Sequence, residues 1–275
     1  MIQQSHHKNT PIIVLMTDFG EDDFFVGSIK GVILKINPRV KIVDLTHRIP
    51  SFNIRAADFI LSACYRYYPS KTIFVVVVDP GVGSSRKILL VKTKDYYFIA
   101  PDNGVLTSVL EVNPPQEIIA LTNSKYFLSK ITSTFHGRDI ISPVAGWLSK
   151  GIPLQEFGSK VSDYLKLDIH LPKIMNGKEI ECEVVYIDKF GNLITNISQK
   201  MIAKDLDLIK SQKISLWIKN KEITTSFRKS YFQGKKDEVF LIYGSLGYLE
   251  IVLNQASAAE RLNISMGEKF RIRIY

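Results

Sequence analysis

An aspartate and an arginine lie seven positions apart in the stretch VVVVDPGVGSSR, residues 75–86. The four valines predict a strand that is buried on both faces, since β-branched side chains pack well on a pleated surface. That strand ends at Asp79, and Arg86 follows a loop that contains two glycines. Because open α/β folds bind ligands at the carboxyl ends of their strands, this arrangement indicates an active site. The alternative is a polar turn without chemistry, because Asp-Pro-Gly is good turn chemistry anywhere.

His136, in the stretch FHGRD at residues 135–139, is the third candidate catalytic side chain. If it converges with Asp79 and Arg86, the three groups can hold and polarise a water molecule. An aspartate accepts a hydrogen bond, a histidine donates or accepts near neutral pH, and an arginine supplies fixed positive charge. The alternative is a structural histidine, and periodicity alone does not bring the three together.

A second group of polar residues lies late in the chain, in IDKFGNLITNI at residues 187–197. Phe190 could stack on a flat ring, Asn192 could hydrogen-bond the edge of that ring, and Asp188 could accept an ammonium group. The stretch GSLGYLEI at residues 244–251 is a similar glycine-rich turn that leads into a strand. The alternative for both stretches is a hairpin whose polar side chains bind no ligand.

Two short matches to known motifs are rejected. MTDFG at residues 16–20 resembles the metal-binding motif of protein kinases, but the other kinase motifs are missing around it. Its Asp18 does share with Asp79 a place at the end of a predicted strand. GVG at residues 81–83 does not indicate a dinucleotide loop, because the following KILLVKT predicts a strand where a helix N-terminus would be needed.

The elements that must position these residues alternate in the first third of the chain. Strands are predicted at 11–16, 40–45 and 73–78, and helices at 24–36 and 54–68. This order predicts an α/β fold with a largely parallel central sheet and helices packed over it.

The pattern changes after Arg86. The next predicted elements are a hairpin at 87–93 and 96–100, a short helix after Asn103, a strand at 117–121 and a helix from about 139 to 151, with a connector at 152–177. From Ile180 onward short alternating strands dominate and predict an all-β segment, a small barrel or sandwich. The predicted organisation is a flexible tail at 1–10, an α/β N-terminal domain at 11–165, a linker at 166–178 and an all-β, barrel-like C-terminal domain at 179–275.

The composition excludes several classes of protein. Of 275 residues, 45% are hydrophobic and 23% are charged, which excludes global disorder. The net charge is +9, but the lysines are dispersed and the aromatic-basic motif of an RNA-binding module is missing, so no nucleic-acid partner is expected. No signal peptide and no apolar run near the ~20 residues of a membrane span is found. Cys64 and Cys182 match no metal or redox spacing and are expected to be buried, reduced thiols of a cytoplasmic protein.

Six motifs in register resemble one known family. They are TDFG, VVDPGVGS, APDNGVLT, FHGRD, FGNLITNI and GSLGYLEI. Their order is similar to that in the adenosine-forming S-adenosyl-L-methionine (SAM) hydrolases, or SAM hydroxide adenosyltransferases, which are related to fluorinase and chlorinase. The resemblance extends from about residue 12 to the C-terminus. It implies that SAM and water give adenosine and methionine, without a metal or cofactor. It also implies a homotrimer with active sites between the N-terminal domain of one subunit and the C-terminal domain of the next.

The resemblance also implies roles for individual residues. The family's catalytic trio falls on Asp79, Arg86 and His136. The implied substrate-binding residues are Asp18 for the ribose hydroxyls, Asp23 and Asp188 for the methionine ammonium, Phe52 and Phe190 for the adenosine faces, Asn192 for the adenine edge, Ser245 for the methionine carboxylate, and Glu250.

The related halogenases differ at informative positions. They carry Tyr in place of Asp79, Thr in place of Val82 and Ser in place of Gly137, which favours water over halide as the nucleophile here. The fluorinase has an arginine where this chain has Leu246. Two alternatives remain within the same pocket, a SAM- or adenosine-binding protein without turnover and a halide-dependent adenosyltransferase. A basic RNA-associated protein is a third alternative, supported by charge alone.

Overall fold

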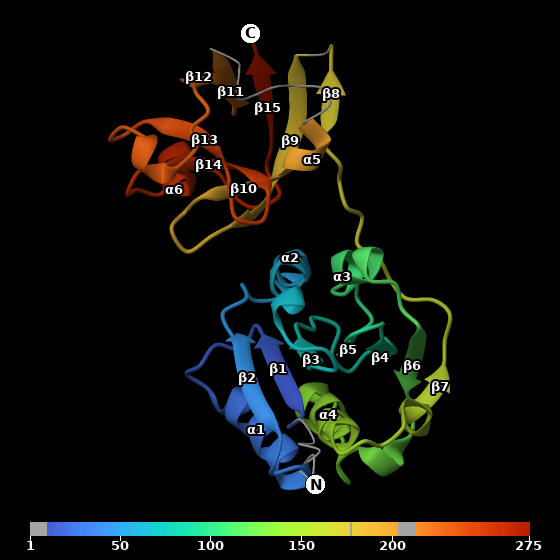
Figure 1. Ribbon diagram of the computed structural model, residues 1–275. Coiled ribbons are helices and arrows are strands. Elements are labelled where there is room, and N and C mark those ends of the chain that lie inside the picture. The colour runs from blue at the N-terminus through green and yellow to red at the C-terminus, as the bar shows by residue number, and fades with distance from the viewer. Residues whose placement is uncertain (1–9, 177, 203–212) are drawn as a thin grey trace, which may run out of the picture. The chain divides into compact units, whose positions relative to one another are not determined.

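The computed structural model describes residues 10–176, 178–202 and 213–275. The chain divides into two compact units, with the boundary between Leu167 and Asp168 (Figure 1). The tail expected at residues 1–10 lies, apart from Thr10, outside the described residues. Each unit is described by itself below.

The first unit is built on a seven-stranded sheet. The order across the sheet is β2 (Lys41–Thr46), β1 (Ile12–Thr17), β3 (Ile73–Val77), β5 (Tyr97–Pro101), β4 (Ile88–Lys92), β6 (Glu117–Leu121) and β7 (Gly158–Lys160). The first four strands pair in parallel, and β4, β6 and β7 continue the sheet in antiparallel pairs. The predicted α/β fold with parallel strands is confirmed, and the predicted β4–β5 hairpin adds an antiparallel half to the sheet.

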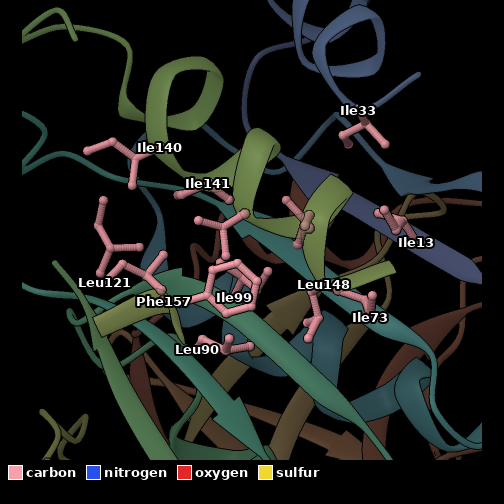
Figure 2. Close-up of a cluster of buried hydrophobic side chains, with 14 of the residues drawn as sticks. Ile13, Ile33, Ile73, Leu90, Ile99, Leu121, Ile140, Ile141, Leu148 and Phe157 are labelled. Carbon is pink, nitrogen blue, oxygen red and sulfur yellow. The ribbon is translucent and has the colours of Figure 1, made fainter. Parts of the chain in front are cut away.

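Helices cover both faces of this sheet (Figure 1). On one face α1 (Phe24–Ile36) packs with α4 (Ser142–Ser149), and on the other α2 (Ile54–Cys64) packs with α3 (Thr107–Val112). An apolar cluster fills the space under α1 and α4, and Figure 2 shows Ile13, Ile73 and Leu148 within it. Burial of each such side chain contributes roughly 1.5–3 kcal/mol. β3 is buried on both faces, as the run of valines predicted, whereas the edge strand β2 is partly exposed.

Several boundaries differ from those predicted. The helix expected at 54–68 ends at Cys64 and continues as one 3₁₀ turn, Tyr65–Tyr67. The helix expected from residue 139 begins as a π-helical turn, Gly137–Ile141, which runs directly into α4. The expected connector at 152–177 is partly structured. It holds a 3₁₀ turn (Leu154–Phe157), β7 on the edge of the first sheet, and β8 (Lys173–Met175), which pairs with a strand of the second unit. Open sheet edges pair readily with a neighbouring segment, which explains why this segment is ordered.

The second unit is an antiparallel, nearly closed barrel, which confirms the all-β prediction. Its strand order is β12 (Lys221–Thr225), β11 (Ile214–Ile218), β15 (Lys269–Ile274), β9 (Glu179–Ile187), β10 (Leu193–Ser198), β14 (Tyr248–Leu253) and β13 (Val239–Tyr243), with β8 on β9. The two end strands approach each other, because the Thr225 hydroxyl donates to the Val239 carbonyl at 2.8 Å. Short helices α5 (Gln199–Ile202) and α6 (Ala258–Leu262) and a 3₁₀ turn, Tyr231–Gln233, lie in the connections.

Cys182 is buried in the barrel and Cys64 is only partly buried, and neither forms a disulfide. Along the described ranges of the chain, no helix combines the length and the apolar character needed to span a bilayer.

Candidate active site

The loop after β3 brings a carboxylate and a guanidinium into direct contact. The Nε atom of Arg86 donates to both carboxylate oxygens of Asp79, at 2.7 and 2.8 Å, and its Nη2 atom also donates to Oδ2. Both side chains are shielded from solvent, with exposed fractions of 6% for Asp79 and 9% for Arg86. Such a forked contact fixes the orientation of both groups as well as their separation.

Gly83 allows this loop to take its shape. Its φ of +82° is in the left-handed region, and a Cβ there would lie 2.4 Å from the carbonyl oxygen of Ser133. Only glycine fits both conditions. The close approach packs the 79–86 loop against the segment that leads to His136.

His136 completes the group. Its Nδ1 atom lies 3.0 Å from Nη2 of Arg86. A guanidinium can only donate, so Nδ1 accepts, and the imidazole is assigned as neutral with its proton on Nε2. Burial and then the charge of Arg86 lower the pKa of His136 below its ordinary value, which agrees with a neutral ring. The structure therefore brings Asp79, Arg86 and His136 into one contact set.

Asp139 anchors the turn that carries His136, and the sequence analysis did not single it out. It is fully buried and accepts hydrogen bonds from the backbone and hydroxyl of Thr132 and from Nε of Arg138. Burial opposes its ionisation, but the hydrogen bonds from Arg138 and Thr132 outweigh it and lower the pKa of Asp139. Its only signal in the sequence was a charged pair within FHGRD, next to the apolar start of a helix.

Asp18 follows β1 at the same edge of the sheet as Asp79, since β1 and β3 are parallel neighbours. Its Oδ2 atom accepts a 2.8 Å hydrogen bond from the backbone of Phe52, which has a left-handed φ of 66°. Burial raises the pKa of Asp18, and the nearby charge of Asp79 adds to the rise. Asp23 is exposed at the N-terminus of α1 and makes no capping hydrogen bond.

In the second unit, Asp188 folds its own turn. Its Oδ1 atom accepts from the backbone of Phe190 and of Asn192, both at 2.9 Å, and its Oδ2 atom accepts from the Asn192 amide at 2.8 Å. Asn192 is buried, whereas the ring of Phe190 is 73% exposed. The turn thus combines an exposed aromatic ring with a carboxylate that is held by three hydrogen bonds.

Tyr231 and Glu250 form a pair that the sequence analysis did not foresee. The Tyr231 hydroxyl donates to Oε2 of Glu250 at 3.0 Å. Gly244, at the start of the GSLG turn, packs so closely that a Cβ there would meet Oε1 of Glu250 at 1.6 Å. Burial raises the pKa values of Glu250 and Tyr231, and the charge of Asp188 raises both further. Ser245 lies exposed in the same turn.

Two family models match the chain, one for each unit. The SAM hydroxide adenosyltransferase N-terminal domain matches residues 13–158, and the C-terminal domain of the same family matches residues 182–271. The chain belongs to the SAM hydroxide adenosyltransferase family.

Known members and relatives of this family are similar over most of the chain. The (R)-S-adenosyl-L-methionine hydrolase of Methanocaldococcus jannaschii is 36% identical over 272 residues, which cover 95% of each chain. A fluorinase of an Actinoplanes species is 28% identical over 220 residues, covering 70% of this chain and 74% of its own. The crystal structure of an uncharacterised conserved protein from Thermotoga maritima is 37% identical and has a TM-score of 0.88. It covers 95% of this chain and 99% of its own.

The predicted site residues fall into two sets, one in each unit. The first unit joins Asp79, Arg86 and His136 by direct contacts and places Asp18 near Asp79. The second unit holds the other set, Asp188, Phe190, Asn192, Ser245 and Glu250.

Proposed function

We propose that the protein hydrolyses SAM to adenosine and L-methionine by in-line attack of water at the ribose C5′ atom. The observation that carries the proposal is the double contact of Arg86, with Asp79 on one side and His136 on the other. A shielded aspartate–arginine pair beside a half-buried neutral imidazole suits a site that holds one water molecule. The family model and the names of the relatives support SAM as the substrate.

In the proposed reaction, the water oxygen forms a bond to C5′ while the bond between C5′ and sulfur breaks. The electron pair stays on sulfur, so the sulfonium becomes the neutral thioether of methionine. Because a sulfonium is already a good leaving group, the reaction needs no Lewis acid, and we propose that it is independent of metals and cofactors. Orientation of water and substrate can supply roughly 7–11 kcal/mol of barrier reduction in favourable cases.

Each residue of the trio has a different role toward the water molecule. With Nδ1 occupied by Arg86, His136 donates from Nε2 to the water oxygen and orients its lone pair. Asp79 retains lone pairs beside those used by Arg86 and takes the proton that the water loses. Arg86 holds both partners and stabilises the hydroxide character that develops.

Substrate binding draws on the remaining residues of both sets. Asp18 holds the ribose hydroxyls, and Asp23 and Asp188 face the ammonium of the methionine part. Phe52 and Phe190 flank the adenosine. Asn192 hydrogen-bonds the adenine edge, and the loop of Ser245 holds the methionine carboxylate. Glu250 and Tyr231 lie beside that loop and contribute to the same binding site.

A homotrimer that brings the two sets of neighbouring subunits together is part of the proposal. Phe52 is 70% exposed and Phe190 is 73% exposed in the isolated chain. Covering these rings with a ligand or a neighbouring subunit would bury apolar area and would favour assembly.

The purified protein incubated with SAM tests the proposal. Equal amounts of adenosine and methionine are expected, with and without a metal chelator. Asp79→Ala and His136→Ala should each lower turnover by ~10² or more, the range for positioned acid–base groups. Binding of SAM without product would favour a sensor, and chloride-dependent formation of 5′-chloro-5′-deoxyadenosine would favour a halogenase. Wild-type turnover in both variants would refute the assignment of the trio.

A further inference from the structure

A buried hydrogen-bonded group lies directly behind Asp18 and has no part in the mechanism above. It consists of Thr17, the last residue of β1, and His47, the residue after β2. Thr17 is fully buried and His47 is 3% exposed, and the Thr17 hydroxyl lies 2.9 Å from Nδ1 of His47. We propose that Thr17 and His47 are positioning residues that hold the Asp18 turn for binding of the substrate. This inference rests on the proposed function, in which Asp18 contacts the ribose.

The two residues hold the backbone on the far side of Asp18. The amide of Phe19 donates to the Thr17 hydroxyl at 3.3 Å, and the amide of Gly20 donates to the His47 carbonyl at 2.7 Å. The two amides that follow Asp18 are therefore both bound to this pair. On its other side, Asp18 itself accepts from the backbone of Phe52.

The imidazole is also held from the opposite direction. Its Nε2 atom lies 3.0 Å from Oδ1 of Asp44, without the alignment of a hydrogen bond. The other oxygen of Asp44 accepts from Nζ of Lys30 of α1 at 2.6 Å. The ring thus lies between the end of β1 and a charged pair that links β2 to α1.

The pairing of β1 with β2 explains how His47 reaches this place. The parallel register shifts between Leu15 and Met16, so that Met16 pairs with Thr46. His47, one residue further, then lies opposite Thr17 at the edge of the sheet where Asp18 emerges. The turn of Asp18 is therefore held by the Thr17 hydroxyl and by the His47 backbone, neither of which needs to touch the substrate.

Substitution of the Thr17 hydroxyl tests this role. Thr17→Val keeps the size of the side chain and removes the bonds to His47 and Phe19. It is expected to lower kcat/KM for SAM about tenfold, mainly by raising KM, which is less than the ~100-fold that a 1 Å misplacement can cost. Thr17→Ser should restore most of the loss. His47→Asn, which can place an amide near the position of Nδ1, should restore more activity than His47→Leu.

Thr93→Val is the matched control. Thr93 is equally buried and hydrogen-bonded, but it follows β4, at the end of that strand opposite to Arg86. Its substitution should lower thermal stability to a similar extent and leave kcat/KM unchanged. An equal loss of kcat/KM in Thr17→Val and Thr93→Val would overturn the proposal.

A double-mutant cycle with Asp18→Ala tests whether the effect passes through Asp18, because residues in one network give non-additive effects. Thr17→Val should have almost no further effect on kcat/KM once the carboxylate is gone. The same fold-loss in both backgrounds would show that Thr17 acts elsewhere and would overturn the proposal.

Amide hydrogen exchange tests the positioning role of Thr17 independently of the proposed function. The amides of Phe19 and Gly20 should exchange faster in Thr17→Val than in wild type or Thr93→Val, with no substrate present. If the wild type forms no adenosine, the proposed function fails, while the exchange measurement still decides the role of Thr17. Unchanged exchange at both amides would overturn the positioning role whatever the turnover.

Discussion

Substitution of Arg86 by lysine tests how far the forked contact matters beyond its charge. Lysine keeps a positive charge but offers one nitrogen, whereas Arg86 uses Nε and Nη2 to reach Asp79 and His136 together. The variant must therefore lose at least one charge-assisted hydrogen bond of the trio. A bond of this kind contributes about 1.5–3 kcal/mol, which in the transition state corresponds to roughly 10–150-fold in rate.

The assay is the rate of adenosine formation at saturating SAM, measured by chromatography, together with thermal unfolding of each variant. Arg86→Lys is expected to lower kcat by about 100-fold, within the range for positioned acid–base groups. Its unfolding temperature should fall less than that of Arg86→Met, because removal of one partner of a buried pair costs about 3–5 kcal/mol.

Arg138→Lys is the matched control for this substitution. Arg138 also pairs with an aspartate, Asp139, through Nε at 2.7 Å, and lies only two residues from His136. Its variant should keep turnover close to that of wild type. Wild-type kcat in Arg86→Lys would refute the reasoning, since charge alone would then suffice.

Three further predictions concern pH, stability and the shape of the loop. His136 must be neutral to accept from Arg86, and burial and then the charge of Arg86 lower its pKa. As the pH is lowered, kcat/KM should therefore fall only below the ordinary pKa of histidine. A fall that begins above that pH would contradict this. Burial raises the pKa of Asp58 from 3.8 to about 6, so its contribution to stability is present below pH 3.8 and is lost as pH rises towards 6. In urea titrations, Asp58→Asn should therefore raise the free energy of unfolding by up to about 3 kcal/mol at pH 7 and change it little near pH 3.5. A lower free energy of unfolding at pH 7 would contradict this prediction. Gly83→Ala should lower turnover because its Cβ would meet the Ser133 carbonyl, whereas Gly267→Ala has a similar φ with open space around it and should leave turnover intact; equal activity of the two variants would contradict the role of the loop.

Elements near the proposed catalytic trio were predictable where they have a strong local signal. The helix predicted at 24–36 has the observed bounds, since apolar residues recur at helical spacing and Pro38 prevents its continuation. The run of valines before Asp79 is a strand buried on both faces. The end of that strand could therefore be placed at the edge of the sheet from the sequence alone.

The contacts within the site depend on the packing of distant segments, and local patterns do not determine them. Arg86 reaches His136 because Gly83 packs against Ser133, a contact between residues fifty positions apart in the chain. His47 carried no distinctive signal, because the shift in register that brings it to Thr17 arises only when β1 and β2 pair. Tyr231 lies in a short turn between β12 and β13, and no motif in the sequence singled it out.

The most direct test of the central claim is a reaction in water enriched in ¹⁸O, with mass analysis of both products. Attack at C5′ by a water molecule held between Asp79 and His136 predicts one ¹⁸O atom in the 5′-hydroxyl of adenosine and none in methionine. Adenosine without the label would show that its 5′-oxygen comes from a donor other than water, such as a protein carboxylate, and would contradict the account, as would the label in methionine.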